Sequence, residues 1–209
     1  MNYIAVIGDV ISSRETADRS ALQERLQAAI SVMNELFRAS LASSFVLTLG
    51  DEFQGLLKAP EELARLLARC RVELFPTEVR FGIGVGPLDT PLEPLSLGMD
   101  GPCFHRAREA VERASNRETY VEVSTTGDST NQPVFSIYAL LSAALRRRWT
   151  ERQRHVVDLT MAGLEGKEIA ARLAITPSAV SQHLRAAGAS AIMEATQDWQ
   201  DALGHGFSV

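Results

Sequence analysis

Three acidic residues stand where a strand and a hairpin would bring them together. Asp9 lies at the end of the apolar run 3–10, and Asp51 and Glu52 lie at a turn between two other apolar runs. Carboxylates gathered at one sheet edge raise one another's pKa unless a cation is present. We therefore predict a divalent ion, Mg²⁺ or Mn²⁺, bound by Asp9, Asp51 and Glu52, with a role in aligning nucleotide phosphates. The alternative for Asp51 alone is a structural role, because Gly-Asp is common in turns.

Ser12, Ser13 and Arg14 directly follow the first carboxylate. Two hydroxyls, the backbone amides of such a loop and a guanidinium group are suited to holding phosphate. We predict a phosphate or nucleotide ligand at these three residues. A polar loop with an exposed arginine is the alternative.

A second candidate site lies near the C-terminus, over residues 149–187. Thr176 followed by Pro177 marks the start of a helix that comes directly after another short apolar helix. This pattern predicts a helix-turn-helix in which the second helix presents a polar face to the DNA major groove. The residues predicted to contact DNA are Ser178, Ser181, Gln182 and Arg185. A three-helix packing or dimerisation module that never contacts DNA is the alternative.

The elements that must position the acidic residues follow the order strand, helix, strand, strand, helix, strand. Strands are expected at 3–10, 43–49, 53–57 and 79–85, with helices after Asp18 and Pro60. This order predicts a ferredoxin-like sheet in which the third strand lies antiparallel to the first. Gly82 and Gly84 alternate in the fourth strand, which favours close approach of a helix on one face. A helix at 104–114 and two short strands, 120–124 and 134–137, are expected next.

The predicted fold class is α+β: a ferredoxin-like, palm-type sheet domain over residues 1–138, followed by an all-α helix-turn-helix domain. Residues 139–148 lack glycine and proline and are expected to form a connecting helix. The second domain covers 149–209 and ends in a helix at 189–203. Its Trp199 is expected to dock on its own domain or on a second copy. A homodimer suits paired DNA half-sites.

Composition limits the class of protein. The chain has 209 residues, of which 45% are hydrophobic and 22% charged, and no apolar run is long enough to span a membrane. Residues 1–138 carry a net charge of −6, and residues 139–209 carry +1. Cys70 and Cys103 form no motif and are expected to be core residues. We expect a cytoplasmic protein without membrane partners, in which His155 and His205 are ordinary surface residues.

Several short segments resemble known families. Residues 6–11, 47–53 and 80–86 resemble, in order, three stretches of class III nucleotide cyclases, and Gly50-Asp51-Glu52-Phe53 is similar to the GGDEF signature of diguanylate cyclases. Residues 101–107 are similar to the start of the late cyclase helix. Residues 8–14 together with 49–55 are closest to the SatD family of bacterial proteins. The resemblance implies a nucleotide-cyclase-like N-terminal domain with metal-binding carboxylates.

The chain departs from the cyclase pattern at the residues that read the base and stabilise charge. The position of the purine-reading lysine is Leu47, and the late helix has His105 and Glu109, next to Arg108, where cyclases have asparagine and arginine. A glutamate cannot stabilise negative charge developing on phosphate. We therefore favour a DNA-binding regulator whose cyclase-like domain binds a metal and a nucleotide or phosphate without efficient turnover. The alternatives are an active cyclase with a regulatory helix-turn-helix, and a dimeric scaffold that binds neither.

Overall fold

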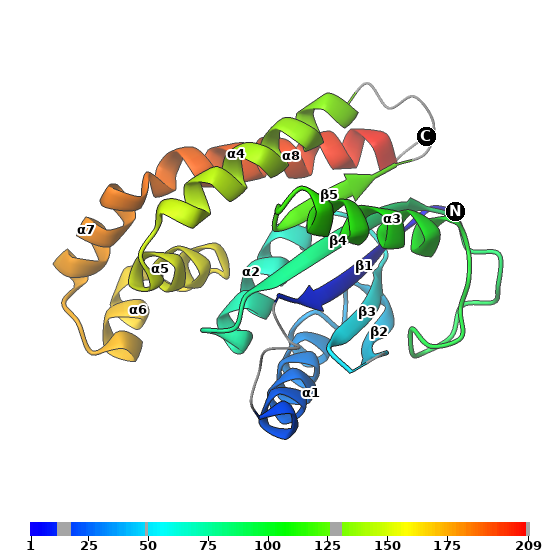
Figure 1. The fold of residues 1–209 in the computed structure, drawn as a ribbon, viewed down its shortest axis with the longest axis horizontal. Coiled ribbons are helices and arrows are strands. Elements are labelled where there is room, and N and C mark those ends of the chain that lie inside the picture. The colour runs from blue at the N-terminus through cyan, green and yellow to red at the C-terminus, as the bar shows by residue number, and fades with distance from the viewer. Residues whose placement is uncertain (12–17, 49, 126–130, 208–209) are drawn as a thin grey trace.

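A five-stranded sheet forms the centre of the molecule (Figure 1). The computed structural model describes residues 1–11, 18–48, 50–125 and 131–207. The strands are β1 (Tyr3–Val10), β2 (Leu41–Leu47), β3 (Glu52–Leu57), β4 (Val79–Gly86) and β5 (Val121–Ser124). Their order is β2-β3-β1-β4-β5, with β1 antiparallel to β3 and β4, and β5 parallel to β4. The α+β class and the predicted placement of the third strand beside the first are confirmed.

The described residues also form eight helices. They are α1 (Arg19–Leu36), α2 (Leu63–Leu74), α3 (Pro102–Asn116), α4 (Gln132–Arg148), α5 (Glu151–Met161), α6 (Gly166–Leu173), α7 (Pro177–Ala187) and α8 (Ala189–Phe207). Three helix starts follow from side-chain caps. Asp18, Thr150 and Thr176 each accept a hydrogen bond from a backbone N–H in the first turn of the helix that follows. These caps confirm the expected starts of α1, α5 and α7.

The two faces of the sheet are covered by different helices. Apolar residues of β1, β3 and β4 pack with those of α1 and α2 on one face. On the other face α3 lies directly on the glycines of β4. A Cβ atom on Gly82 would overlap the backbone of Ala107, and one on Gly84 would overlap the backbone of Cys103. The alternating glycines therefore allow the helix to approach, as predicted.

The strand expected at 134–137 is wrong, because these residues lie in the first half of α4. Pro133 lies in the first turn of this helix, where its missing N–H leaves no helical hydrogen bond unmade. A four-residue apolar run has no period long enough to distinguish strand from helix. The expected connecting helix, 139–148, is the second half of the same uninterrupted helix.

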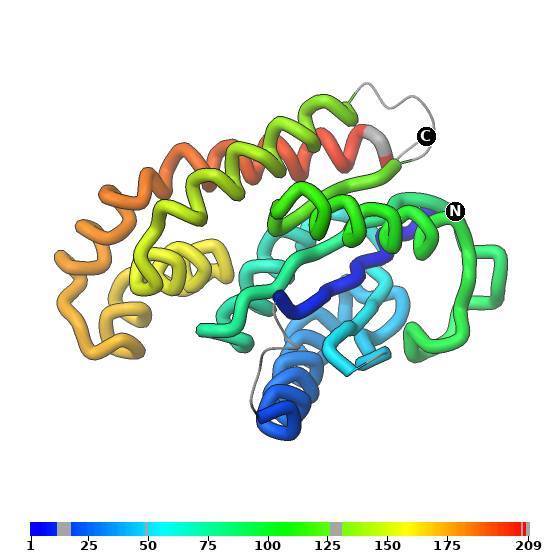
Figure 2. The backbone as a smooth tube through the Cα atoms, viewed as in Figure 1, coloured from blue at the N-terminus to red at the C-terminus, as the bar shows by residue number. Residues whose placement is uncertain are grey.

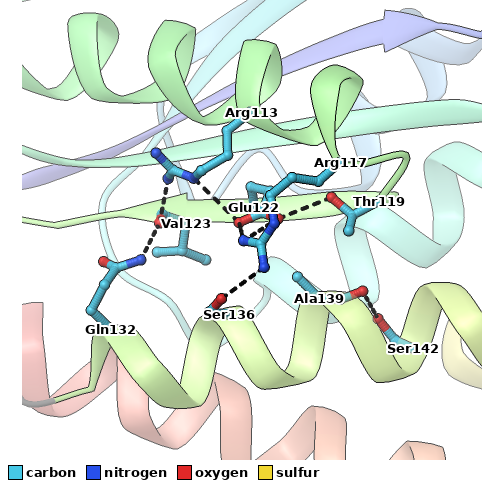
Figure 3. Close-up of polar contacts among 9 residues, drawn as sticks. All are labelled: Arg113, Arg117, Thr119, Glu122, Val123, Gln132, Ser136, Ala139 and Ser142. Atoms are coloured by element: carbon cyan, nitrogen blue, oxygen red, sulfur yellow. Dashed lines mark hydrogen bonds and ion pairs between the residues drawn. The ribbon is translucent and has the colours of Figure 1, made fainter.

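A buried carboxylate joins β5 to the C-terminal end of α3 (Figure 3). Glu122 is 1% exposed and forms ion pairs with Arg113 and Arg117, and it accepts a hydrogen bond from the Thr119 hydroxyl at 3.1 Å. Arg117 also donates to the Ser136 hydroxyl of α4 at 3.0 Å. One acidic side chain thus holds a strand and, through Arg117, two helices in fixed relation.

The C-terminal helices pack back onto the sheet layer. Val156 and Leu159 of α5 share an apolar cluster with Ala68 and Val72 of α2. Trp199 of α8 enters the main core, so it docks on the sheet part of the same chain and not on its own predicted domain. The predicted boundary at residue 138 falls inside α4, and the division into two domains stays a prediction.

The two ends of the chain lie on the same side of the molecule (Figure 2). The side-chain amide of Asn2 donates to the carbonyl of Phe207 at 3.4 Å.

Among the described residues, no helix has both the length and the hydropathy needed to cross a membrane.

Three of the single-residue expectations are confirmed and one is wrong. Cys70 and Cys103 are buried and free, and His205 is exposed, as expected. His155 is 9% exposed, and its ring lies 3.9 Å from that of Phe75, so it is not a surface residue. Helical spacing places it on the inner side of α5, where it contacts Phe75 at the end of α2.

Candidate functional site

Two of the three predicted acidic residues face each other at one edge of the sheet. Asp9 of β1 is the register partner of Glu52 of β3. Register partners point to the same face, here the face that α3 covers. Asp51 precedes Glu52 in the turn, and its carbonyl accepts a hydrogen bond from the Val10 N–H at 3.3 Å. The topology therefore brings together residues that are more than 40 positions apart in the sequence.

Two arginines complete a cluster of four charges, which we call the charge quartet: Asp9, Glu52, Arg80 and Arg108. Arg80 of β4 is the other register partner of Asp9, and its Nε lies 3.3 Å from Asp9 Oδ2. Arg108 of α3 binds the Glu52 carboxylate through both terminal nitrogens, with Nη2 2.6 Å from Oε1. The quartet carries no net charge.

The arginines were not predicted, but the sequence contained a signal for one of them. Arg80 alternates with Gly82 and Gly84, so it shares their face of β4 and must point the same way as Asp9. The position of Arg108 depends on how α3 crosses the sheet, which no local pattern specifies.

Burial dominates the electrostatics of Asp9. It raises the pKa of this carboxyl group above its usual value, and the neighbouring charges of Asp51 and Glu52 raise it further. Arg80 and, more weakly, Arg108 oppose these effects. The negative charges of Asp51 and Glu52 therefore act directly on the Asp9 carboxyl group.

The quartet in this arrangement does not match a divalent cation site. A metal ion needs several free oxygen ligands, whereas the carboxylates of Asp9 and Glu52 already contact guanidinium groups. Within the described ranges, no three acidic, histidine or cysteine side chains gather in a metal-binding arrangement. The Mg²⁺ or Mn²⁺ site at Asp9, Asp51 and Glu52 stays a prediction that requires the arginines to move.

A cavity of about 390 Å³ lies beside Arg80. It is lined by Ile11, Arg80, Ser115, Glu118, Thr119, Tyr120 and Arg147. This volume is within the range of ligand pockets, about 300–1,000 Å³. The predicted phosphate-binding residues Ser12, Ser13 and Arg14 follow Ile11 directly in the chain, but they lie outside the described residues.

The residues that replace the cyclase base-reading and charge-stabilising groups do not join the quartet. Leu47 is packed against the main core beside Phe53. Glu109 is exposed, and exposed His105 contacts Asp100 at 3.0 Å. On α3 it is Arg108, one position before Glu109, that reaches the sheet edge.

The four residues predicted to contact DNA all lie on α7. Ser178, Ser181, Gln182 and Arg185 are exposed. The opposite side of α7 carries Val180, which is 1% exposed and packs with Ile169 and Ala170 of α6. Between the two helices the chain makes a tight turn, in which Ala174 adopts a left-handed conformation with φ 51°.

Comparison with solved structures gives nucleotide cyclases of low similarity. The catalytic core of a rhodopsin-guanylyl cyclase with converted specificity, in complex with ATPαS, has 18% identity and a TM-score of 0.35, and the match covers 53% of this chain and 71% of that chain. The guanylyl cyclase Cya2 has 15% identity and the same TM-score, with 54% and 70% covered.

None of the curated proteins matches this chain. The family comparison is more informative, because it spans nearly the whole sequence and includes both the sheet and the C-terminal helices. The model of the SatD family matches residues 3–202, and the chain belongs to this family.

Proposed function

We propose that this SatD family protein is a DNA-binding regulator that contacts the major groove through α7. The observation that carries the proposal is the division of α7 into two sides. Its apolar side is buried against α6, while Ser178, Ser181, Gln182 and Arg185 face solvent. An exposed helix that a second short helix supports across a tight turn is the arrangement of a helix-turn-helix.

Basic side chains around this helix supply contacts for phosphate. Lys167 at the start of α6 and Arg172 at its end are exposed, and so is Arg152 of α5. Phosphate contacts position a protein on DNA, whereas the base contacts of residues such as Gln182 give sequence preference. The segment as a whole is nearly neutral, which favours moderate affinity with a measurable salt dependence.

The position of α7 in the molecule also supports this role. Helices α5, α6 and α7 lie at one end of the molecule, away from the sheet (Figure 1). Because α5 packs on α2, these three helices are fixed to the rest of the protein and are not attached only through a flexible linker. Such a unit can enter a groove while the rest of the protein stays clear of the duplex.

We propose that the protein works as a homodimer that forms through α4. Five large apolar side chains of this helix are between 36% and 61% exposed, namely Val134, Ile137, Leu140, Leu141 and Leu145. Val134, Ile137, Leu141 and Leu145 recur at spacings of three and four, the repeat of helices that pair along their length. No charged residue occurs between Gln132 and Leu145.

A second copy of the chain is the occupant that fits this face. An uncharged apolar helix face is complementary to itself, so a two-fold axis through α4 pairs it with its own equivalent. A two-fold axis also gives two copies of α7, as binding to paired half-sites requires.

The dimer is tested by sedimentation velocity. We expect wild-type protein at about twice the monomer mass of 22.8 kDa. The double substitution Ile137→Asp and Leu141→Asp should give monomer, because it places charge in the interface. Leu97→Asp is the matched control, since Leu97 is 63% exposed but lies in the loop before α3. Wild-type protein that remains monomeric at micromolar concentrations contradicts the dimer.

DNA binding is tested by titration at two salt concentrations, with promoter fragments from the protein's own genomic neighbourhood and with random duplex. Gln182→Ala should lower sequence preference by about 1–3 kcal/mol. Arg185→Ala should weaken binding to every duplex and reduce the salt slope by about one. Arg38→Ala is the control, because Arg38 is exposed and follows α1. If wild-type protein binds no duplex at low salt, the DNA-binding proposal is wrong.

For the sheet part of the protein, we propose ligand binding without efficient turnover. The cavity beside Arg80 is large enough for a nucleotide-sized ligand, and Arg80 and Arg147 are both in its lining. Leu47 and Glu109 occupy the positions at which cyclases have a lysine and an arginine, and this difference argues against cyclase chemistry. Isothermal titration with ATP, GTP and their monophosphates tests this proposal, and an Arg80→Met variant should lose any binding that is found.

A further inference from the structure

A small cavity lies where the sheet layer meets the C-terminal helices. Its volume is about 40 Å³. One water molecule needs about 10–15 Å³ on this measure, so the cavity has room for a few water molecules or for a group of four or five heavy atoms. A nucleotide does not fit. Residues from α2, α4, α5 and α8 line it, among them Arg71, Arg146, Tyr138, Ser142, Trp149 and Trp199.

The two arginines of this cavity differ in their partners. Arg146 is 6% exposed and binds the Asp158 carboxylate with both terminal nitrogens, at 2.9 and 2.8 Å. It also forms an ion pair with Glu78 at 3.1 Å. Its charge is therefore compensated twice.

Arg71 differs in having no ion-pair partner among the described residues. Among the residues that the structure describes, no carboxylate lies within ion-pair distance of its guanidinium group, and its buried Nε has no hydrogen-bond partner. Its contact is with an aromatic face, since the guanidinium carbon lies 5.2 Å from the centre of the Phe81 ring. Arg71 as a whole is partly buried, and a cation–π contact offsets part of the cost of removing its charge from water.

The local charge balance leaves one positive charge over. Three arginines, Arg71, Arg146 and Arg154, lie near two carboxylates, Asp158 and Glu78. Glu78 pairs with two of the arginines, since its carboxylate lies 3.1 Å from Arg146 Nε and 3.3 Å from Arg154 Nε. Burial, followed by the nearby charge of Arg146, lowers the pKa of Arg71, and the charges of Asp158 and Glu78 oppose this effect only in part. A monovalent negative charge in the cavity would remove the imbalance.

We propose that this cavity binds a small oxyanion, of the size of phosphate or a short carboxylate, next to Arg71. Arginine suits such groups because its planar fork donates two parallel hydrogen bonds. Ser142 and Tyr138 line the same cavity, with the Ser142 hydroxyl donating to the Ala139 carbonyl at 3.2 Å and the Tyr138 hydroxyl bonded to Thr196 at 2.8 Å. The Asp158 carboxylate also lines it, and both terminal nitrogens of Arg146 bind that carboxylate. The anion would bridge α2 to the helices that follow the sheet. This site is independent of the DNA-binding proposal.

The chain offers a direct optical readout of this site. It has only two tryptophans, Trp149 and Trp199, and both line the cavity. Tryptophan fluorescence is therefore titrated with sodium phosphate and, separately, with sodium acetate, each against sodium chloride at the same ionic strength. We expect a saturable change with at least one oxyanion, together with a rise in melting temperature. The two titrations distinguish a phosphate site from a carboxylate site.

Two variants on the same helix make the test specific. Arg71→Met keeps the length of the side chain without its charge and should weaken binding at least tenfold. Folding should survive this change, because Arg71 has no ion-pair partner whose charge would be left without compensation. Arg65→Met is the control, since Arg65 lies on α2 and its side chain is 51% exposed. A response to chloride equal to that of both oxyanions, no saturable response in wild-type protein, or an unchanged response in Arg71→Met would overturn the proposal.

Discussion

Replacing Glu122 by alanine should destabilise the protein substantially, because this buried carboxylate compensates two guanidinium groups at once. It accepts from Arg113 Nε at 3.3 Å, from Arg117 at 3.1 Å and from Thr119 at 3.1 Å. Removing one partner of a buried ion pair costs about 3–5 kcal/mol. Both arginine side chains are 32% exposed, however, so water can reach them after the substitution.

Partial solvation places the expected loss in the free energy of unfolding at the lower end, about 3 kcal/mol. For a chain of this length, 1 kcal/mol shifts the melting temperature by about 2–4 °C. We therefore expect a decrease of roughly 6–12 °C, because the shift scales with the loss. Urea unfolding followed by circular dichroism measures the free energy, and differential scanning calorimetry measures the temperature.

Two controls separate the ion-pair network from a general effect of substitution. Glu112→Ala removes an exposed carboxylate from the same α3 helix and should change stability by less than about 0.5 kcal/mol. Glu122→Gln keeps the shape and one acceptor, so its cost should lie between those of the two alanine variants. A Glu122→Ala variant within 0.5 kcal/mol of wild type would refute the reasoning, since it would mean that the network contributes little net stability.

Three further predictions concern the sheet edge and α5. Purified protein with Mg²⁺ or Mn²⁺ should convert little or no ATP or GTP to cyclic products; robust formation that Asp51→Ala abolishes would instead favour the enzyme alternative. Arg108→Met should tighten Mn²⁺ binding severalfold in calorimetric titration, because it frees the Glu52 carboxylate; equal affinity in both proteins would show that the ion pair does not block the site. Burial, followed by the charge of Arg172, lowers the pKa of His155 below its ordinary 6.5. The unfolded chain therefore binds the extra proton first, and stability should fall as the pH drops below about 6.5. His155→Phe should flatten this dependence in urea unfolding at pH 7.5 and 5.5, and an unchanged slope would assign the effect to other groups.

Much of the fold could be predicted because it is encoded over short stretches of chain. The helix caps Asp18, Thr150 and Thr176 act on amides within the next turn, so a few residues are enough to recognise them. The alternation of Gly82 and Gly84 predicted a helix against β4 for the same reason. The order of strands and helices then placed Asp9 opposite the hairpin.

The amphipathic pattern of α7 was equally local. Val180 is on the buried side, and Gln182 and Arg185 are exposed, as a period of 3.6 residues requires. Sequence alone therefore predicted which side chains of this helix face solvent. Whether these side chains contact DNA is tested by the titration with duplex DNA.

Tertiary structure decided the partners of the charged groups. Glu52 meets Arg108 because of the angle at which α3 crosses the sheet, and Arg71 is left without an ion-pair partner because of how α2 packs against α5 and α8. His155 is buried against the end of α2, about 80 residues earlier in the chain. These outcomes depend on the distances between elements that are remote in sequence. The sequence by itself specified which residues could carry charge or form an apolar face, whereas packing determined which of those charges are compensated.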